Sequence, residues 1–300
     1  MPRVESAKNT RRRLRSRWTG WAFLAPFATA FVIVFIAPII YSLYLSLFSK
    51  QLIGGEKFVG FANFSRAFSD PELWNGAGRV VIFFCVQVPI MLFISLYMAL
   101  VLDSRRLHGT AFFRISVFIP YAVPAVVAAL MWGFMYGTRF GLVGNINRAL
   151  NIHIPDPLGP DLMLAAIGNI VTWEFIGYNM LILYSSLKAI PNSLYEAAAI
   201  DGASQFRIIW SIKLPAIRGA LVIALIFSVI GSFQLFNEPN VLKTLAPNVI
   251  TSHYTPNLYA YSLSFSGQQP NYSATVAIIM GIITMIVAYV VQLRGMKTND

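Results

Sequence analysis

Six long apolar runs constrain the fold of this chain more than any other feature of its sequence. Each run approaches the roughly 20 apolar residues that a helix needs to cross a bilayer. The runs cover residues 21–47, 80–102, 115–136, 162–187, 219–236 and 274–293. Inside a bilayer the backbone has to satisfy its own hydrogen bonds, and a single run does so as a helix. The sequence therefore predicts an all-α membrane protein with six transmembrane helices.

The distribution of charge supports the membrane interpretation and orients the helices. Only 12% of the residues are charged, against about 25% in an ordinary soluble domain. With the N-terminus inside, the cytoplasmic segments carry 16 of the 23 Lys and Arg residues. Because basic residues are retained on the cytoplasmic side, this excess predicts that both termini are cytoplasmic. The net charge of +11 therefore reflects membrane topology, and no nucleic-acid partner is expected.

The chain is expected to consist of a short basic segment and one membrane domain. Residues 1–18 form the basic cytoplasmic N-terminus, and residues 19–300 form the six-helix domain, with a cytoplasmic loop at 188–218. The apolar stretch 18–49 is far longer than the core of a signal peptide, and no clear cleavage site follows it. The first helix is therefore expected to remain in the membrane.

Prolines are expected to shape the first and third helices. Pro26 and Pro38 should break the first, and Pro120 and Pro124 should bend the third, because proline removes a helical hydrogen bond and clashes with the preceding turn. In a membrane the freed carbonyl groups need neighbouring helices or water as partners, so a bent helix usually faces the bundle interior. The third helix is thus a gate or cavity-lining element, or alternatively a kinked structural helix.

A polar island, residues 193–215, lies between the fourth and fifth apolar runs. Ser193 and Glu196 have the spacing of a capping box, in which each side chain accepts a hydrogen bond from the other residue's backbone amide. Gly202 can adopt the left-handed conformation that ends a helix. Ser204 can cap a second helix. The island therefore predicts two short helices joined by a turn.

The second of these short helices should carry Phe206, Ile209 and Trp210 along one side, and Pro215 should end it. An apolar face exposed between two membrane helices is suited to docking another protein. The alternative is an ordinary amphipathic loop helix with no partner.

The sequence of residues 193–215 also matches a family pattern. Glu196-Ala-Ala is followed after two residues by Asp201-Gly-Ala, and later by Ile212-x-Leu214-Pro215. This long, ordered combination resembles the cytoplasmic coupling loop of permease subunits of ABC importers. The resemblance implies that an ATPase docks on a set of residues in this loop: Glu196, Ala197, Ala198, Asp201, Gly202, Ala203, Phe206, Leu214 and Pro215. Glu196 would then be a capping and docking residue, not an acid or base.

Two further stretches resemble the sugar class of these permeases, which includes the maltose and glycerol-phosphate permeases. They are Phe58-Val-Gly60-x-x-Asn63-Phe64 and the third span from Pro120 to Trp132. The resemblance implies a bacterial cell-membrane complex with a second permease subunit, an ATPase dimer that binds ATP and Mg, and an extracytoplasmic sugar-binding protein. An oligosaccharide or glycoside would cross this complex, embedded in membrane lipid, by alternating access. The chain itself would bind no cofactor.

Residues inside the fourth run are candidates to line a sugar path. Glu174 is the one carboxylate well inside an apolar run, and a charge there normally faces a cavity or a partner. Trp173, Tyr178 and Asn179 lie nearby, and sugars bind to such mixtures of aromatic faces and polar groups. The alternatives are a structural hydrogen bond for Glu174 and simple packing for Trp173.

The end of the fifth run supplies three more lining candidates, Phe233, Gln234 and Asn237. This segment resembles a family stretch in which an aromatic-Asp pair precedes a glycine-rich turn. Here Asn237 takes the Asp position and residues 245–247 replace the glycines, so the turn is expected to differ. Aromatic residues near helix ends can instead belong to the belt at the membrane interface.

The sequence contains no motif for chemistry of its own. It has no glycine-rich phosphate loop, no hydrolase or protease motif, and no group of residues with metal-ligand spacing. The chain is therefore expected to be a transport subunit and not an enzyme, with no metal site. Two other classes remain open at this point: an ion-coupled secondary transporter, and a membrane scaffold subunit that transports nothing.

Overall fold

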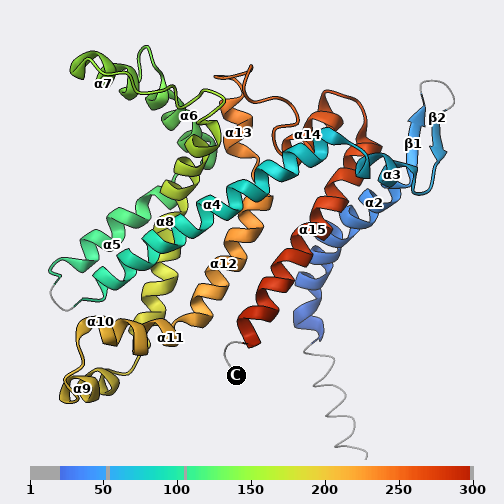
Figure 1. Ribbon diagram of the computed structural model, residues 1–300. Coiled ribbons are helices and arrows are strands. Elements are labelled where there is room, and N and C mark those ends of the chain that lie inside the picture. Colours follow the sequence, from blue (N-terminus) through green and yellow to red (C-terminus); the bar gives the residue numbers. More distant parts are fainter. Residues whose placement is uncertain (1–20, 52–54, 105–106, 298–300) are drawn as a thin grey trace, which may run out of the picture.

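The computed structural model describes residues 21–51, 55–104 and 107–297. The expected basic segment 1–18 lies outside these residues. The described chain is an elongated bundle of helices with smaller elements gathered at its two ends (Figure 1). The predicted all-α membrane architecture is confirmed, and the described residues add only a small β-hairpin.

Within the described residues, five helices are long and apolar enough to cross a membrane. They are Trp21–Ser46, Pro71–Leu102, Met163–Lys188, Arg218–Leu242 and Pro270–Gly295. A sixth crossing is present if the bent pair Thr110–Ala122 and Ala125–Tyr136 is counted as one span. The six predicted runs thus correspond to five continuous spans and one broken span.

The third span is bent sharply at its prolines. It consists of α5 (Thr110–Phe118), η2 (Ile119–Ala122) and α6 (Ala125–Tyr136). Its two halves meet at 97°. Val123 is extended, with ψ of 128°, because the ring of Pro124 disfavours a helical conformation in the residue before it. The expected bend is confirmed, and it is a complete break in the helix.

The first span, by contrast, is not broken by its prolines as expected. It contains the π-helical turn η1 (Val32–Ile36), followed directly by α2 (Ala37–Ser46). Pro38 has no amide hydrogen to donate to the carbonyl of Val34, four residues earlier. Val34 lies within the wider π-helical turn. The same arrangement recurs at η3 (Ile209–Lys213), which precedes Pro215. A local change of helical pitch accommodates each proline while the helical path continues.

Short elements occupy the two ends of the bundle (Figure 1). One end holds β1 (Phe48–Gln51), β2 (Gly55–Phe58), α3 (Ala62–Phe68), α7 (Leu142–Leu150), α13 (Asn237–Leu242) and α14 (Pro256–Phe265). The opposite end holds α9 (Asn192–Ile200), α10 (Gln205–Ile208), η3 and α11 (Leu214–Ala216). The C-terminal end of α15 (Pro270–Lys297) points toward this second end.

The long helices pack side by side. α4 (Pro71–Leu102) lies along α8 (Met163–Lys188), and α12 (Arg218–Phe233) contacts both α4 and α15. A Cβ atom on Gly177 of α8 would lie 2.1 Å from the backbone oxygen of Val117 in α5. Only glycine fits at that point, so the α5–α8 contact depends on a close backbone approach.

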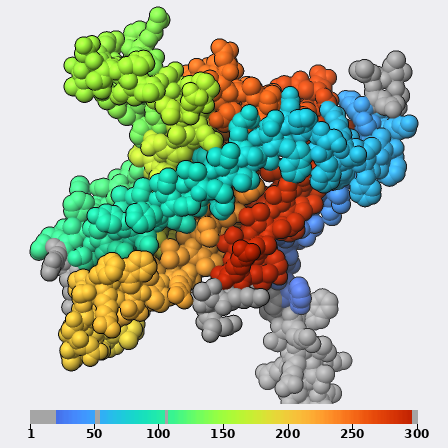
Figure 2. All heavy atoms as spheres, viewed as in Figure 1, coloured from blue at the N-terminus to red at the C-terminus, as the bar shows by residue number. Residues whose placement is uncertain are grey.

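Large apolar side chains cover much of the outside of the bundle. In the first span Phe23, Phe27 and Ile33 are all exposed. A continuous apolar exterior is unfavourable in water and marks a surface covered by lipid or by other subunits. In the space-filling view, the loop between α8 and α12 forms the lower left end of the molecule and protrudes beyond the long helices (Figure 2).

Candidate functional site

The projecting loop, residues 189–217, begins with α9. This helix starts at Asn192 and has Pro191 at its N-cap, with no side-chain cap. The capping box expected between Ser193 and Glu196 is therefore wrong, because the helix begins before Ser193 and includes it. Pro191 has the extended conformation of an N-cap residue, with φ −59° and ψ 135°. Pro191, and not Ser193, therefore determines where α9 begins.

The turn after α9 has the conformation expected from the sequence. Gly202 has φ of +70°. Its amide donates to the carbonyl of Ala199 at 3.1 Å, and the amide of Ala203 donates to Ala198 at 2.9 Å. This pair of bonds is a Schellman motif, in which a left-handed residue satisfies the last carbonyl groups of a helix. Glycine is favoured at such a position because it has no side chain to clash.

The second short helix also begins as expected. The Ser204 hydroxyl accepts a hydrogen bond from the Arg207 amide at 3.3 Å and so caps α10. The helical path then continues through η3 into α11 and ends at Ala216, one residue after Pro215. Short-range hydrogen bonds therefore determine the turn at Gly202 and the start of α10.

The loop presents an apolar surface to its surroundings. Phe206 is 71% exposed and Trp210 is 58% exposed, and their rings lie 6.0 Å apart. Ile200 of α9 is also exposed. Most of the residues proposed for ATPase coupling are exposed, and three are half-buried: Ala198, Ala203 and Leu214.

A buried ion cluster holds the base of the loop. Asp103, at the C-cap of α4, binds Lys213 of η3 at 2.6 Å and Lys188 of α8 at 3.0 Å. The side chains of Asp103 and Lys213 are only 8% and 11% exposed. Tyr195 of α9 has its ring beside the Lys213 ammonium group. Burial raises the pKa of Tyr195, and the charge of Asp103 adds to this effect. Three helical segments are thus joined at one carboxylate.

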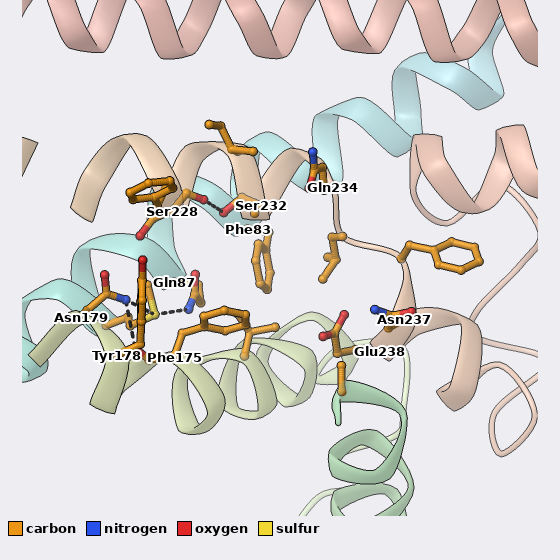
Figure 3. Close-up of a pocket in the computed structure, with 18 of the residues that line it drawn as sticks. Phe83, Gln87, Phe175, Tyr178, Asn179, Ser228, Ser232, Gln234, Asn237 and Glu238 are labelled. Carbon is orange, nitrogen blue, oxygen red and sulfur yellow. Dashed lines mark hydrogen bonds between the residues drawn. The ribbon is translucent and has the colours of Figure 1, made fainter. Parts of the chain in front are cut away.

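A cavity of about 380 Å³ lies inside the bundle, toward the middle of α8. Its wall comes from α4, η2, α6, α8, α12 and the segment that leads into α13 (Figure 3). Aromatic rings form one part of this wall. Tyr121 stacks on Tyr178 at 4.9 Å, and Phe175 meets Tyr121 edge to face. Amide, hydroxyl and carboxyl groups and several aliphatic side chains form the rest of the wall.

The structure brings together four of the seven residues expected to line a path. Tyr178 and Asn179 of α8 lie in the cavity wall with Gln234 and Asn237. The other three lie outside this wall. Trp173 packs edge to face on Trp132, Phe233 lies in a buried cluster with Phe84, and Glu174 is buried in α8.

Several lining residues were not identified from the sequence. They are Phe83 and Gln87 of α4, Tyr121 of η2, Phe175 of α8, Ser228 and Ser232 of α12, and Glu238 of α13. Gln87 carried a usable signal, because it is a strongly polar residue within the apolar run 80–102. Glu238 did not, because it follows the fifth apolar run in a polar segment. The aromatic members carried none, since aromatic residues are common throughout these helices.

A helical membrane bundle with an internal polar and aromatic cavity and a projecting helical loop is typical of a transport subunit. The family described as "Binding-protein-dependent transport system inner membrane component" matches residues 67–295. The chain belongs to this family. The predictions of a permease subunit of an ABC importer, and of a transport component and not an enzyme, are therefore confirmed.

Individual relatives agree with this assignment. The lactose transport system permease protein LacF of Rhizobium radiobacter is 31% identical over 90% of this chain and 91% of its own length. The sulfoquinovosyl glycerol transport system permease protein SmoG of Agrobacterium fabrum is 31% identical over 95% of both chains. A crystal structure of a bacterial ABC transporter involved in alginate import shares the fold, with a TM-score of 0.85 at 16% identity, over 97% of this chain and 100% of that chain.

Proposed function

We propose that this chain is one of two permease subunits in an ATP-driven importer that moves a sugar across the bacterial inner membrane by alternating access. The relatives LacF and SmoG are named for the transport of lactose and of sulfoquinovosyl glycerol. The cavity combines aromatic rings with amide and hydroxyl groups, which is the combination that binds sugar rings and hydroxyls. Tyr178, Asn179, Gln234 and Asn237 are the proposed contacts that the sequence also suggested.

One observation carries this proposal: the two helices that flank the projecting loop also line the cavity. α8 contributes Phe175, Tyr178 and Asn179, and it runs directly into the loop after Lys188. α12 contributes Ser228 and Ser232, and it begins directly after the loop. At 1.5 Å per residue, Asn179 lies about 14 Å from the end of α8. A displacement of the loop would therefore move two walls of the cavity.

The coupling partner in this proposal is a dimer of separate ATPase subunits, which bind ATP and Mg. The exposed face of the loop, with Phe206 and Trp210, would dock in a groove of the ATPase. Helix-in-groove recognition uses apolar anchors of this kind. Glu196, Ala197, Asp201, Gly202 and neighbouring loop residues would surround the anchors. The remaining partners are a second permease and an extracytoplasmic sugar-binding protein.

The proposed orientation has both termini in the cytoplasm. The excess of Lys and Arg in the segments on the side of the projecting loop supports it. The C-terminal end of α15 also points toward the end of the bundle that holds the loop. A reporter fused after Asp300 should therefore give a cytoplasmic signal, and an external signal would invert the topology.

Alternating access requires that ATP and sugar favour different states of the complex. A ligand shifts a conformational equilibrium only to the extent that it binds the two states with different affinities. ATP binding by the ATPases would close them, move the docked loop and open the cavity outward. Release of ADP and phosphate would restore the inward-facing state. Glu174, which is buried beside the cavity, is proposed to support substrate-dependent transport.

The test is reconstitution of the complete complex in lipid vesicles. The proposal predicts that ATPase subunits copurify with the tagged chain and that sugar uptake needs both ATP and the binding protein. Uptake driven by an ion gradient without ATP would favour a secondary transporter. A complex that assembles but transports nothing under any of these conditions would favour a scaffold subunit.

A further inference from the structure

Three polar side chains of the cavity wall already use a hydrogen-bond donor within the protein. The Asn179 Nδ2 group donates to the Phe175 carbonyl at 3.0 Å. The Ser228 hydroxyl donates to Ala224 and the Ser232 hydroxyl donates to Ser228, both at 2.8 Å. Figure 3 shows the last of these bonds in the cavity wall. The oxygen atoms of the same side chains keep lone pairs that can accept.

Gln87 follows the same pattern. Its Nε2 group lies 3.2 Å from the Thr172 hydroxyl and 3.4 Å from the Met91 sulfur. Its Oε1 atom is buried and has no hydrogen-bond partner within the described part of the chain. Gln87 as a whole is only 6% exposed, and it lies in the cavity wall. An unpartnered buried acceptor costs free energy, which a donor on a bound molecule would recover.

Glu238 adds a carboxyl group to this set of acceptors. It lies near the start of α13, is 6% exposed, and its side chain points into the cavity (Figure 3). A second carboxyl group, Glu174, is buried in α8 at 4% exposure. The Oε2 atom of Glu174 also lacks a hydrogen-bond partner among the described residues. Glu238 therefore gives this end of the cavity wall a carboxyl group.

No positive charge balances these groups in the wall. Among the described residues that line the cavity, none is Lys, Arg or His. Arg79, also on α4, is directed elsewhere: it lies over the Tyr254 ring and within 3.4 Å of the Tyr254 carbonyl. An anionic sugar would enter the cavity without a counter-charge, and burying an unpaired charge is costly.

We propose that this cavity selects an uncharged, hydroxyl-rich saccharide and excludes sugars that carry a carboxylate, sulfonate or phosphate group. The hydroxyl groups of a neutral sugar would donate to Gln87 Oε1, to the amide and serine oxygens, and to Glu238. An anionic group would meet the Glu238 carboxyl group, with no Lys, Arg or His among the described lining residues to balance its charge. This inference rests on the proposed function. It predicts that this chain differs in substrate charge from relatives that transport anionic sugars.

The test is a thermal-unfolding assay on the purified complete complex, because a ligand that binds only the folded protein raises its unfolding temperature. The probes are lactose and trehalose as neutral sugars, and sulfoquinovosyl glycerol and an alginate disaccharide as anionic ones. The binding protein is left out, so its own selectivity does not enter. We expect stabilisation by a neutral sugar at concentrations where the anionic sugars have no effect.

A substitution in the cavity wall then tests whether the wall is responsible for the selectivity against anionic sugars. In Glu238→Gln, the amide removes the carboxyl group and adds an N–H donor, so the affinity for the anionic probes should rise about tenfold, while the neutral probe changes much less because the amide oxygen can still accept. The matched control is Glu56→Gln, which removes a carboxyl group from the exposed strand β2. This control should keep the wild-type pattern.

The outcomes separate this inference from the proposed function. Equal or greater stabilisation of the wild-type complex by the anionic sugars would overturn the charge selectivity while leaving sugar transport intact. ATP-driven uptake of a neutral sugar with unchanged discrimination in Glu238→Gln would overturn the role of Glu238. Uptake of these sugars without ATP, or a tagged chain with which no ATPase copurifies, would instead remove the proposed function itself.

Discussion

The projecting loop and the cavity are connected through α8 and α12, which flank the loop and line the cavity. Different kinds of interaction stabilise the loop and the cavity wall. In the loop, the bonds at Gly202 and Ser204 span no more than five residues of chain. In the cavity wall, Gln87 bonds across to Thr172 and Tyr121 stacks on Tyr178, so distant segments meet. The loop can therefore keep its shape while it moves, whereas the cavity changes whenever α8 and α12 move relative to α4. The Asp103 cluster joins the two regions.

The largest effect is expected from Asp103→Asn, which would break the joint between loop and bundle. It leaves the buried Lys213 ammonium group without its carboxylate partner, and breaking a buried ion pair costs roughly 3–5 kcal/mol. We expect lower thermal stability of the complex and ATP hydrolysis that no longer drives uptake. Differential scanning fluorimetry and a sugar-to-ATP ratio would measure the two effects.

Lys188→Ala is the matched control for this joint. It removes the other partner of Asp103, but Lys188 is 53% exposed, and an exposed ion pair contributes only about 0–1 kcal/mol. Equal damage in the two variants would show that the buried Lys213 pair is not what holds the loop to the bundle.

The next effect concerns the cavity side of the comparison. Gly177→Ala would place a Cβ atom 2.1 Å from the Val117 carbonyl oxygen. Separation of α5 from α8 should cost about 1–3 kcal/mol, as other overpacked contacts do. Because Tyr121 and Tyr178 lie on the two sides of this contact, sugar affinity should fall together with stability. In Gly281→Ala, where a Cβ atom meets nothing within 4 Å, both quantities should stay near wild type.

Gly202→Val tests the loop without touching the cavity. A β-branched residue in the left-handed conformation costs about 1–2 kcal/mol, and this cost falls on the turn between α9 and α10. The variant should insert in the membrane and bind sugar normally, but it should recruit ATPase poorly or move less sugar per ATP. Normal recruitment together with a normal sugar-to-ATP ratio would remove the coupling role of the turn.

The smallest effect is expected from Ser204→Ala. It removes the cap of α10, which is typically worth about 1 kcal/mol. Because Phe206 and Trp210 follow this cap, their position on the loop surface should become less fixed. We expect a several-fold weaker association with the ATPase in a pull-down titration, with rescue by Ser204→Asp. An unchanged affinity in Ser204→Ala would show that docking orders the helix by itself.

The same contrast explains what the sequence could predict. The turn at Gly202 and the cap at Ser204 depend on neighbouring residues, so local pattern was sufficient for both. Ser193 was misassigned as the N-cap because Pro191 takes that position two residues earlier. Local pattern alone does not decide between two possible N-caps so close in the chain. The six apolar runs and the bend at Pro120 and Pro124 were likewise visible in the sequence.

The cavity wall was predicted only in part, because its members come from segments far apart in the chain. Phe83, Tyr121 and Phe227 meet there through helix packing that no local pattern encodes. The rotation of α8 decided which of its polar residues face the cavity: Asn179 does, and Glu174 does not. In the same way, the rotation of α12 directs Phe233 toward Phe84. Helix periodicity alone could not give that rotation, since apolar residues surround these helices on all sides.

The most direct test of the central claim measures whether the loop controls access to the cavity. The native Cys85 is replaced by Ser, and Ser228 in the cavity wall is replaced by Cys. A membrane-impermeant thiol reagent then labels the cavity from either side of the vesicle, with and without ATP. The account predicts that ATP speeds labelling from outside and slows it from inside, and that adding Gly202→Val abolishes this dependence. Labelling rates that ignore ATP, or that respond to ATP equally in Gly202→Val, would contradict it.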